Sequence, residues 1–456
     1  MNSHTTFNSI YPYTGETVGT YTALTESELS IKISEGEKRY LSWRTTSLDQ
    51  RSQCLSKLGD VLNGHKDKLA KLITMEMGKP IKESIGEIEK CAITCDFYAK
   101  HGQGFLARKY MDNFPNCYID FLPLGGILAI MPWNFPFWQV IRCAVPALLA
   151  GNVVFLKHAP NVFGCAQALQ EVFEEAGFPP HVFQTLIIDV DAVETVIAHP
   201  FVRAVSFTGS EKGGAQVAAL SGKYIKKTVL ELGGSDPAII LDDADMPLAV
   251  KRGLTSRLMN AGQSCIAAKR FIVVKSKEAA FVEHVLEEMK QYQVADPLDE
   301  NTKIGSLARQ DIADNIAEQL RISLESGSEL IYDGGAAKDC IFPPKVLKVI
   351  STDDVLFKEE TFGPLLAYLV VNDEETAINI ANKTSYGLGA SIYTADIENA
   401  RRIAGRLECG SVFINDLVKS GAGYPFGGVK NSGYGRELSY FGLYEFTNIQ
   451  TVFVGS

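Results

Sequence analysis

The sequence predicts an α/β protein with two α/β units, the first of which has a parallel sheet. Its 456 residues exceed what one hydrophobic core normally organises, so we expect two or three domains. Apolar runs of strand length alternate with helical patterns from 117 to 242, and a second alternation runs from 238 to about 428. Alternation of this kind predicts parallel strands joined by right-handed crossovers, an architecture that binds ligands at the carboxyl ends of its strands.

The N-terminal part is predicted to contain a hairpin followed by helices. Residues 1–24 are turn-rich, and Tyr11 to Thr17 form a turn between two short strands. From Ser27 to about Arg108, leucines and valines recur at helix-face spacing. Gly78-Lys79-Pro80 interrupts this pattern, and a new amphipathic helix begins at Ile81.

Buried strands and covering helices then follow in turn. In the first unit we expect strands at 126–131, 153–156, 182–188 and 204–207, with helices near 136–149, 161–177, 191–198 and 211–222. In the second unit we expect helices at 251–259, 277–292 and 311–326, with strands at 271–274 and 365–371. A final strand at 446–454 pairs either with 117–122 or with the edge of another subunit.

Composition argues against several classes of protein. A net charge of −10 disfavours a nucleic-acid or anionic-membrane partner, and no apolar run has the length of a membrane span. The nine cysteines include no CxxC pair and the seven histidines no HExxH motif, so we expect reduced thiols and no metal site. Because the N-terminus has no secretory signal, we expect a soluble cytoplasmic protein.

The short turn from Asn260 to Cys265 places one cysteine between a helical segment and a strand. Gly262, Gln263 and Ser264 are unusual neighbours for a core cysteine. Backbone N–H groups on such a turn are free to stabilise an oxyanion, which suits a nucleophile. We therefore interpret Cys265 as a candidate nucleophile, with a buried structural cysteine as the alternative.

Four further motifs follow predicted strands or flank turns. Asn134, with a proline two residues away on either side, either presents an amide N–H to a substrate oxygen or caps a helix. Gly209 and Ser210 either open a phosphate-binding helix or form a plain turn. Glu231, before a glycine pair, and Glu360, two residues before an aromatic, are either functional or solvated acids.

In this order, and with the closing stretch from Pro425 to Glu437, the five motifs resemble the aldehyde dehydrogenase superfamily along essentially the whole chain. The resemblance implies an aldehyde dehydrogenase-like fold with a Rossmann-type cofactor domain, an α/β catalytic domain and a small β bridging domain. The implied cofactor domain spans 1–112 and 126–231, the catalytic domain 232–428, and the bridging strands 113–125 and 440–456. Such bridging strands imply a homodimer or a homotetramer.

The resemblance also implies NAD(P)-dependent oxidation of a small-molecule aldehyde to a carboxylate. Cys265 is expected to attack the aldehyde as a thiolate, giving a thiohemiacetal whose oxyanion is bonded by the Asn134 side chain and the Cys265 N–H. Loss of hydride leaves a thioester, and Glu231 activates the water that hydrolyses it. One alternative is a relative that transfers the acyl group to coenzyme A; such relatives usually lack the carboxylate of Glu231. The other is an inactive structural or binding protein, which would tolerate loss of Cys265, Asn134 or Glu231.

Further residues are implied to hold the dinucleotide: Trp133, Lys157, Pro160, Gly209, Ser210, Glu360 and Phe362. Pro160 departs from the family pattern, because many NAD-preferring members carry a glutamate there. Proline neither binds a ribose 2′-hydroxyl nor repels a 2′-phosphate. Since the string from Lys157 to Val162 looks like NAD-accepting bacterial relatives, we expect NAD or NADP, with NAD preferred.

The same string resembles bacterial succinate-semialdehyde dehydrogenases, so the expected substrate is succinate semialdehyde or, alternatively, another short aliphatic or aromatic aldehyde. Those enzymes carry an arginine for the distal carboxylate at the position of Arg142; its alternative is a pair with a structural acid. Some relatives have an arginine six residues before the cysteine, where this chain has Met259, and Arg257 is considered as its substitute. The remaining pocket residues are expected to be Trp138, Ser264, Tyr424 and Phe426.

Overall fold

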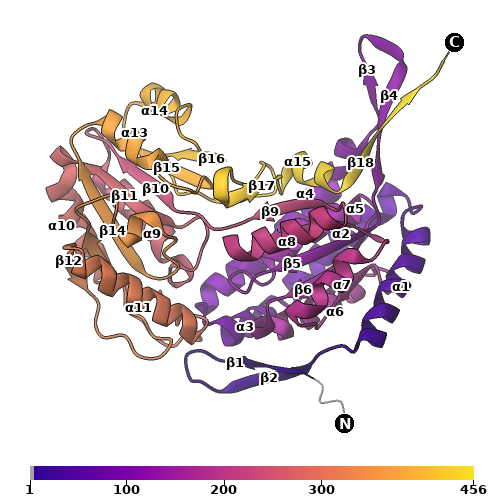
Figure 1. The fold of residues 1–456 in the computed structure, drawn as a ribbon, viewed down its shortest axis with the longest axis horizontal. Coiled ribbons are helices and arrows are strands. Elements are labelled where there is room, and N and C mark those ends of the chain that lie inside the picture. The colour runs from indigo at the N-terminus through magenta and orange to yellow at the C-terminus, as the bar shows by residue number, and fades with distance from the viewer. Residues whose placement is uncertain (1–4, 456) are drawn as a thin grey trace.

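The computed structural model describes residues 5–455, which form two large sheets with flanking helices and a smaller sheet that projects from one end (Figure 1). A hairpin precedes four helices: β1 (Thr6–Ile10), β2 (Thr17–Thr22), α1 (Glu26–Trp43), α2 (Leu48–Gly64), α3 (Lys66–Met77) and α4 (Ile81–Leu106). The predicted hairpin and helical stretch are confirmed. No helix within residues 5–455 has the length and apolarity that crossing a membrane requires.

Local sequence explains where these helices begin and end. Thr25 and Ser47 start α1 and α2 with reciprocal side-chain and backbone hydrogen bonds of the capping-box type. Gly78 ends α3 in the left-handed conformation with φ of 78°, which glycine adopts without steric cost. Pro80 then precedes α4, because a proline is tolerated where helical N–H groups have no partner.

A six-stranded sheet organises the first unit, in the order β17-β9-β8-β5-β6-β7. Its strands are β5 (Gly126–Met131), β6 (Val153–His158), β7 (Phe183–Thr185), β8 (Val202–Thr208), β9 (Lys227–Glu231) and β17 (Gly433–Tyr434). The first five run parallel, and β17 joins β9 antiparallel, so that Gly433 lies opposite Glu231. The loops after β5 and β8 therefore leave the sheet at the same edge.

The helices of this unit are α5 (Trp138–Leu149), α6 (Phe163–Glu175), α7 (Val193–Ala198) and α8 (Glu211–Lys223), with the 3₁₀ helices η1 (Pro160–Val162) and η2 (Val190–Ala192). Every residue of α5 is buried, which explains its continuous apolar sequence. The expected strand 182–188 is too long: the chain leaves the sheet after Thr185 toward η2, while Leu186 and Ile188 stay buried.

A seven-stranded sheet organises the second unit, in the order β12-β13-β14-β11-β10-β15-β16. Its strands are β10 (Asp236–Ile240), β11 (Ala268–Val274), β12 (Glu329–Asp333), β13 (Lys345–Lys348), β14 (Leu365–Val371), β15 (Gly389–Tyr393) and β16 (Ser411–Ile414). Its helices are α9 (Met246–Leu258), α10 (Glu278–Met289), α11 (Gln310–Glu325), α12 (Val355–Lys358), α13 (Glu374–Asn382) and α14 (Ile397–Ala404), with η3 (Met259–Gly262) and η4 (Lys275–Lys277). Helices on both faces bury the central strands, as parallel sheets require.

The projecting sheet contains three antiparallel strands in the order β18-β4-β3 (Figure 1). The elements at the end of the chain are η5 (Lys430–Ser432), α15 (Ser439–Glu445) and β18 (Thr447–Phe453), and the partners of β18 are β4 (Phe114–Pro123) and β3 (Lys109–Met111). β18 pairs with its own chain, from Thr447 opposite Pro123 to Phe453 opposite Cys117. The first of the two expected pairings is therefore present. β3 lies within the segment 1–112 that the sequence assigns to the cofactor domain.

Candidate active site

The turn that carries Cys265 begins with three consecutive residues in the left-handed conformation. Asn260 and Ala261 both have φ of 52°, and Gly262 follows with φ of 77°. A Cβ atom at Gly262 would meet the Gly363 carbonyl, so this position requires glycine. Each non-glycine residue in a sparsely populated conformation costs about 1–3 kcal/mol, which surrounding contacts have to offset.

Glu83 of α4 supplies one of these contacts. Its Oε2 accepts a 2.7 Å hydrogen bond from the Asn260 backbone N–H. Burial raises the pKa of the Glu83 carboxyl to about 7, and the Asn260 hydrogen bond opposes this shift. Sequence reasoning missed Glu83, because a glutamate on an amphipathic helix carries no local sign of a partner 177 positions away.

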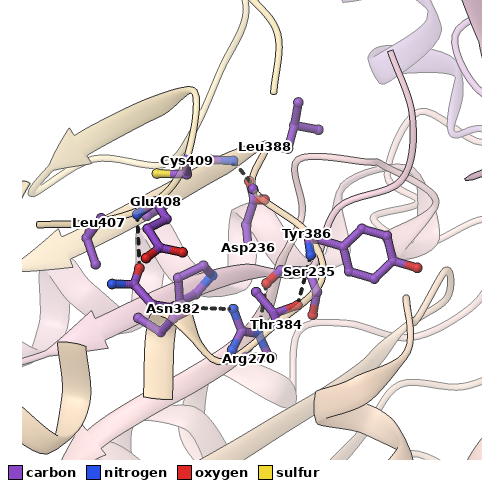
Figure 2. A pocket seen from close by; sticks show the side chains of 15 residues that line it. Ser235, Asp236, Arg270, Asn382, Thr384, Tyr386, Leu388, Leu407, Glu408 and Cys409 are labelled. Atoms are coloured by element: carbon purple, nitrogen blue, oxygen red, sulfur yellow. Dashed lines mark hydrogen bonds between the residues drawn. The ribbon is translucent and has the colours of Figure 1, made fainter. Parts of the chain in front are cut away.

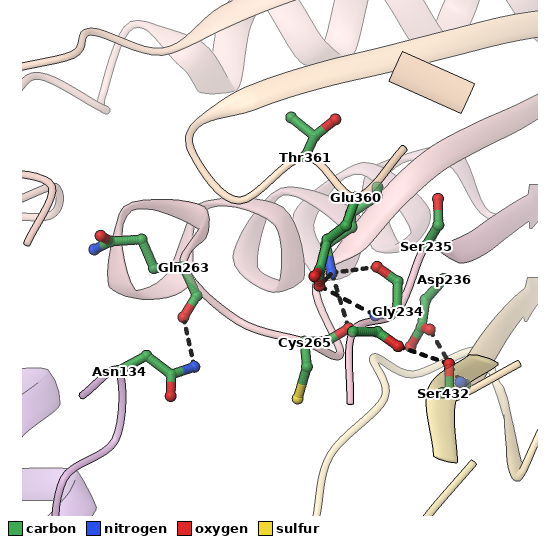
Figure 3. A network of polar contacts seen from close by, with 12 residues as sticks. Asn134, Gly234, Ser235, Asp236, Gln263, Cys265, Glu360, Thr361 and Ser432 are labelled. Atoms are coloured by element: carbon green, nitrogen blue, oxygen red, sulfur yellow. Dashed lines mark hydrogen bonds and ion pairs between the residues drawn. The ribbon is translucent and has the colours of Figure 1, made fainter. Parts of the chain in front are cut away.

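Lys269, four residues after the cysteine, joins three segments around it. Its buried Nζ donates to the carbonyls of Gly234 at 2.6 Å and Cys265 at 2.9 Å, and to Glu360 Oε1 at 2.7 Å. Glu360 Oε1 also accepts from the Gly234 N–H at 3.1 Å. Figure 3 shows Gly234 and Glu360 on one side of Cys265. The backbone of the cysteine is therefore held independently of its thiol.

Asn134 lies on the opposite side of Cys265 from Gly234 (Figure 3). The side-chain Nδ2 of Asn134 donates to the backbone carbonyl of Gln263 at 3.0 Å. The backbone carbonyl of Asn134 accepts from Asn260 Nδ2 at 2.8 Å. An amide carries two hydrogens, so the second N–H of Asn134 remains for a ligand oxygen. The alternative of an N-cap is wrong, because α5 begins after Phe137.

Glu87 holds the loop that follows Asn134. Its Oε1 accepts from the backbone N–H groups of Phe137 at 2.8 Å and Trp138 at 3.0 Å. These groups open α5, and a carboxylate is favoured at the positive end of a helix dipole. The Oε2 atom forms a buried ion pair with Lys79, which neutralises the charge.

His158, at the end of β6, holds the same loop from the other side. Burial lowers the pKa of His158 to about 4, so the ring is neutral at pH 7. Since Nδ1 accepts from the Ala159 N–H at 2.9 Å, the hydrogen resides on Nε2, which donates to the Pro136 carbonyl at 2.9 Å. The rigid prolyl turn is thus anchored to the neighbouring strand.

Cys265 lies where two cavities meet, and its side chain is partly buried. Burial raises the pKa of the Cys265 thiol to about 11, while Arg142 and Lys269 lower it. The thiol is therefore largely protonated at pH 7 in this geometry. A nucleophilic role requires that its proton be removed during the reaction.

Glu231 ends β9 and is buried, and neither of its carboxyl oxygens has a hydrogen-bond partner within residues 5–455. Burial raises the pKa of this carboxyl well above its ordinary value; Glu437 adds to the shift and Arg142 opposes it. Gly233, two residues later, lines the same cavity as Cys265, whereas Glu231 does not. A buried carboxyl without a partner beside a cavity is a candidate proton acceptor.

The first cavity, of about 210 Å³, opens at the carboxyl ends of β5 and β8. It brings together five of the residues predicted to hold a dinucleotide: Trp133, Gly209, Ser210, Glu360 and Phe362. The rings of Trp133 and Phe362 meet edge to face at 5.8 Å, and Ser210 caps α8 by accepting from the Gly213 N–H at 3.2 Å. An aromatic wall next to a helix N-terminus fits a nicotinamide dinucleotide, whose phosphates such a terminus can bind.

Lys157 and Pro160, the other two predicted cofactor residues, do not line this cavity. Lys157 is buried near the end of β6, and burial lowers the pKa of its amine. It has no ion-pair partner within the described chain. Pro160 is exposed at the start of η1, beyond the end of the same strand.

The second cavity, of about 100 Å³, lies on the other side of Cys265. Four predicted substrate residues line it, and the lining residues that were not predicted include two polar ones: Trp138, Arg142, Ser264, Phe426, and then Lys90 and Ser420. Tyr424 is not among the lining residues; its hydroxyl donates to the Lys419 carbonyl at 3.1 Å. A wider hollow of about 700 Å³ shares part of the wall and continues it outward, at Lys90, Phe135, Trp138 and Met259.

Both predicted substrate arginines have protein partners. Arg142 forms a buried ion pair with Glu437, which is the alternative partner that the sequence left open. Its guanidinium also lines the second cavity. Arg257 is fully buried, donates to the Thr361 and Gly363 carbonyls and lines neither cavity. The structure therefore does not bring Arg257 to either cavity, because its side chain is bonded to the loop that follows Glu360.

A small polar hollow of about 10 Å³ lies behind the site, between Asp236, Arg270 and Cys409 (Figure 2). Arg270 Nε donates to the Ser235 carbonyl at 2.8 Å, and Asp236 Oδ1 accepts from the Gly389 N–H at 3.0 Å. These bonds fix the start of β10, directly after the segment that follows Glu231. The hollow has room for about one water molecule and supports the site without opening to it.

Comparison with known proteins places these features in one family. The family model described as "Aldehyde dehydrogenase family" matches residues 1–452. The chain belongs to the aldehyde dehydrogenase family. This assignment confirms the predicted resemblance, the fold class and the class of enzyme.

Several relatives of this aldehyde dehydrogenase are similar over nearly its whole length. It is 44% identical over 447 residues to a succinate semialdehyde dehydrogenase of Escherichia coli (strain K12) whose name gives NAD(P)+, covering 97% of each chain. It is 43% identical to a probable succinate-semialdehyde dehydrogenase of Synechocystis (strain PCC 6803) whose name gives NADP+, covering 98% of this chain and 99% of the other. The crystal structure of succinic semialdehyde dehydrogenase from Streptococcus pyogenes with NADP+ superposes with a TM-score of 0.96 at 37% identity, covering 99% and 100%.

Proposed function

We propose that this aldehyde dehydrogenase oxidises succinate semialdehyde to succinate with a nicotinamide dinucleotide. The observation that carries the proposal is the position of Cys265 between two cavities, one with an aromatic wall and a helix N-terminus and one lined by cationic side chains. Relatives at 43–44% identity that are named for this activity support the choice of substrate.

In the proposed mechanism, the Cys265 sulfur adds to the aldehyde carbon after losing its proton. The free N–H of Asn134 and the Cys265 backbone N–H hold the oxygen that becomes negative, and each such donor contributes about 2.7–4 kcal/mol to the transition state. When bound here, a nicotinamide dinucleotide would supply the acceptor for the hydride of the thiohemiacetal carbon. Trp133, Ser210, Glu360 and Phe362 would hold its nicotinamide half beside Cys265.

Release of the product requires hydrolysis of the thioester on Cys265. Glu231 is the proposed general base: it takes a proton from water, and the resulting hydroxide attacks the carbonyl carbon and expels the thiolate. A carboxyl with a raised pKa is a stronger base once ionised, which suits this step. The Arg142–Glu437 pair lies next to it and influences its ionisation.

A panel of aldehydes that differ in length and charge tests the proposal. We expect succinate semialdehyde to have a kcat/KM at least about 10-fold above that of butanal, because a charged interaction contributes about 1.5–3 kcal/mol. Succinate should form without coenzyme A, and added coenzyme A should not divert the product into a thioester. A uniform kcat/KM across the panel would contradict the substrate assignment.

We propose that the enzyme accepts NADP as well as NAD. The preference for NAD expected from the sequence is not supported, since the relatives described above are named for NAD(P)+ or NADP+. Pro160 has no carboxylate to repel a 2′-phosphate, and Lys157 is a buried amine without an ion-pair partner in residues 5–455. We expect the ratio of kcat/KM for NADP over NAD to fall when Pro160 is replaced by Glu. An unchanged ratio would place the 2′-phosphate elsewhere.

We also propose the division into a cofactor domain, a catalytic domain and bridging strands, and assembly as a homodimer or homotetramer. The projecting sheet supports this assembly, because it exposes apolar side chains at Tyr110, Met111, Phe114, Ile449 and Phe453. Exposed apolar patches on a sheet are typical of interfaces. Light scattering coupled to size exclusion should give two or four chains, and replacement of Phe453 by Lys should shift the mass to one chain.

A further inference from the structure

Most buried lysines of the described chain are neutralised by a carboxylate. The pairs are Lys79 with Glu87, Lys269 with Glu360 and Lys345 with Asp333. Lys157 is the buried exception, and the half-buried Lys90 likewise has no carboxylate within residues 5–455 in ion-pair distance of its Nζ. Holding an ammonium group away from water without a counter-ion is unfavourable, and proteins usually avoid it.

The Lys90 ammonium instead lies against neutral groups on the wall of the second cavity. Its Nζ donates to Ser420 Oγ at 2.8 Å and lies 3.9 Å from the centre of the Trp138 ring. Lys90 lines both the cavity at Cys265 and the wider hollow outside it. An anion that enters from the hollow toward Cys265 therefore passes this ammonium group.

Ser420 is oriented to act with Lys90. Its Oγ accepts two hydrogen bonds, from Lys90 Nζ and from Trp138 Nε1 at 3.2 Å. Because both donors approach the oxygen, the hydroxyl hydrogen is directed away from them and is free for a ligand. Lys90 and Ser420 together present N–H and O–H donors, the groups that a carboxylate binds best.

Arginine is less suited to this role here. Arg142 already forms an ion pair with Glu437, and Arg257 is bonded to backbone carbonyls outside the cavity. Met259 lines the cavity without a charge. Among the cationic residues that line the second cavity, Lys90 is the one without a carboxylate partner in the described chain, since Lys419 pairs with Asp416.

We infer that Lys90, together with Ser420, binds the distal carboxylate of the aldehyde substrate and determines the preference for an acidic aldehyde. The inference rests on the function proposed above. It assigns the preference for a negatively charged aldehyde to Lys90 of α4 and not to Arg142 of α5. Arg142 then acts as a positioning residue, which orients Glu437 and the base of the cavity.

The ionisation of Lys90 supplies a signature that a structural role would not produce. Burial and the nearby Arg142 lower the pKa of Lys90 to about 8, Lys79 acts in the same direction, and Cys91 and Glu87 oppose them. The ammonium form is present below this pKa and is lost above it. Recognition of a carboxylate should therefore weaken as the pH rises through about 8, whereas recognition of an uncharged aldehyde should not.

The test compares kcat/KM for succinate semialdehyde with that for butanal in the holoenzyme. Lys90→Met should lower this ratio by about 10- to 100-fold, the effect of one charge-assisted hydrogen bond. Lys90→Arg should retain most of the ratio because the charge remains. The matched control is Lys100→Met, an exposed lysine on the same helix, which should leave the ratio unchanged.

Two further measurements keep the inference falsifiable if Lys90→Met fails to fold. Ser420→Ala should lower the same ratio, and the wild-type ratio should fall between pH 7 and about 9. Changes in the ionisation of Cys265 cancel in the ratio, since both aldehydes need the same thiolate. An unchanged ratio in Lys90→Met, or a ratio independent of pH, overturns the inference. A wild-type enzyme without any preference for the acidic aldehyde overturns the proposed function instead.

Discussion

The two cavities that meet at Cys265 are built in different ways. On the dinucleotide side, Glu360 is paired with Lys269 and also accepts from the Gly234 backbone N–H. On the aldehyde side, the wall includes side chains from α4, α5 and the loop before Phe426, and Lys90 has no carboxylate partner in the described chain. We therefore expect the chemical steps to depend on the dinucleotide-side cavity and the choice of aldehyde to depend on the aldehyde-side cavity.

This contrast predicts two kinds of variant. Changes on the dinucleotide side, or at the residues that hold the Cys265 turn, should affect all aldehydes alike. Changes on the aldehyde side should affect one aldehyde more than another. The predictions that follow test this separation, beginning with the largest effect.

Replacing Cys265 by Ala should lower kcat/KM by more than about 10⁴-fold for every aldehyde, because no other group can form the covalent intermediate. Dinucleotide binding should be retained, since the other residues of that cavity are intact, and fluorescence titration measures it. The control is Cys54→Ala, a partly exposed cysteine on α2. Turnover above about 1% of wild type in Cys265→Ala would exclude the assigned nucleophile.

Glu231→Gln should lower steady-state turnover by about 10³-fold while leaving one rapid burst of reduced dinucleotide per site. In the wild-type enzyme the pKa of Glu231 is raised well above its ordinary value, so the basic form gains population as pH rises. Hydrolysis of the thioester should accelerate with pH, and the variant should lose this dependence. Stopped-flow absorbance measures both phases, and absence of the burst would contradict a role confined to hydrolysis.

Asn134→Ala should lower kcat by about 10²-fold through loss of one oxyanion donor. The effect should be equal for succinate semialdehyde and butanal, because the donor acts on the reacting oxygen and not on the distal group. Steady-state kinetics with both aldehydes measures it. A loss confined to succinate semialdehyde would mean that the two cavities are not separate in function.

Glu83→Ala should have the smallest effect, about 10-fold in kcat for every aldehyde. The variant removes the acceptor for the Asn260 N–H, so the left-handed turn before Cys265 relaxes. Glu83→Gln keeps an acceptor oxygen at this position and should restore most of the activity. Equal losses in the two variants would show that the charge, and not the hydrogen bond, matters.

The architecture could be predicted well from the sequence, because most strands and helices correspond to local patterns of apolar residues and helix breakers. Strands β5 and β14 have the bounds that their apolar runs indicate, and Gly78-Lys79-Pro80 separates α3 from α4 as expected. The end of β7 was placed too late, since Leu186 and Ile188 are apolar for burial and not for strand pairing. Periodicity reports burial directly and sheet pairing only indirectly.

The candidate site was only partly predictable. Cys265, Asn134 and Glu360 belong to compact motifs, so their proximity to one cavity could be anticipated. Lys90 and Glu83 lie on a helix more than 150 residues before the cysteine, among charges that look solvated. Their roles depend on tertiary partners, which no spacing within the helix reveals.

The short strand β17 has a consequence for how the enzyme matures. Its Gly433 is the register partner of Glu231, although the two are far apart in the chain. Because β9 is synthesised long before β17, its edge and the future base lack this neighbour until the chain has been extended past Gly433. β17 follows all the other strands of this sheet in the chain, so the strand beside the base is the last of the sheet to be synthesised.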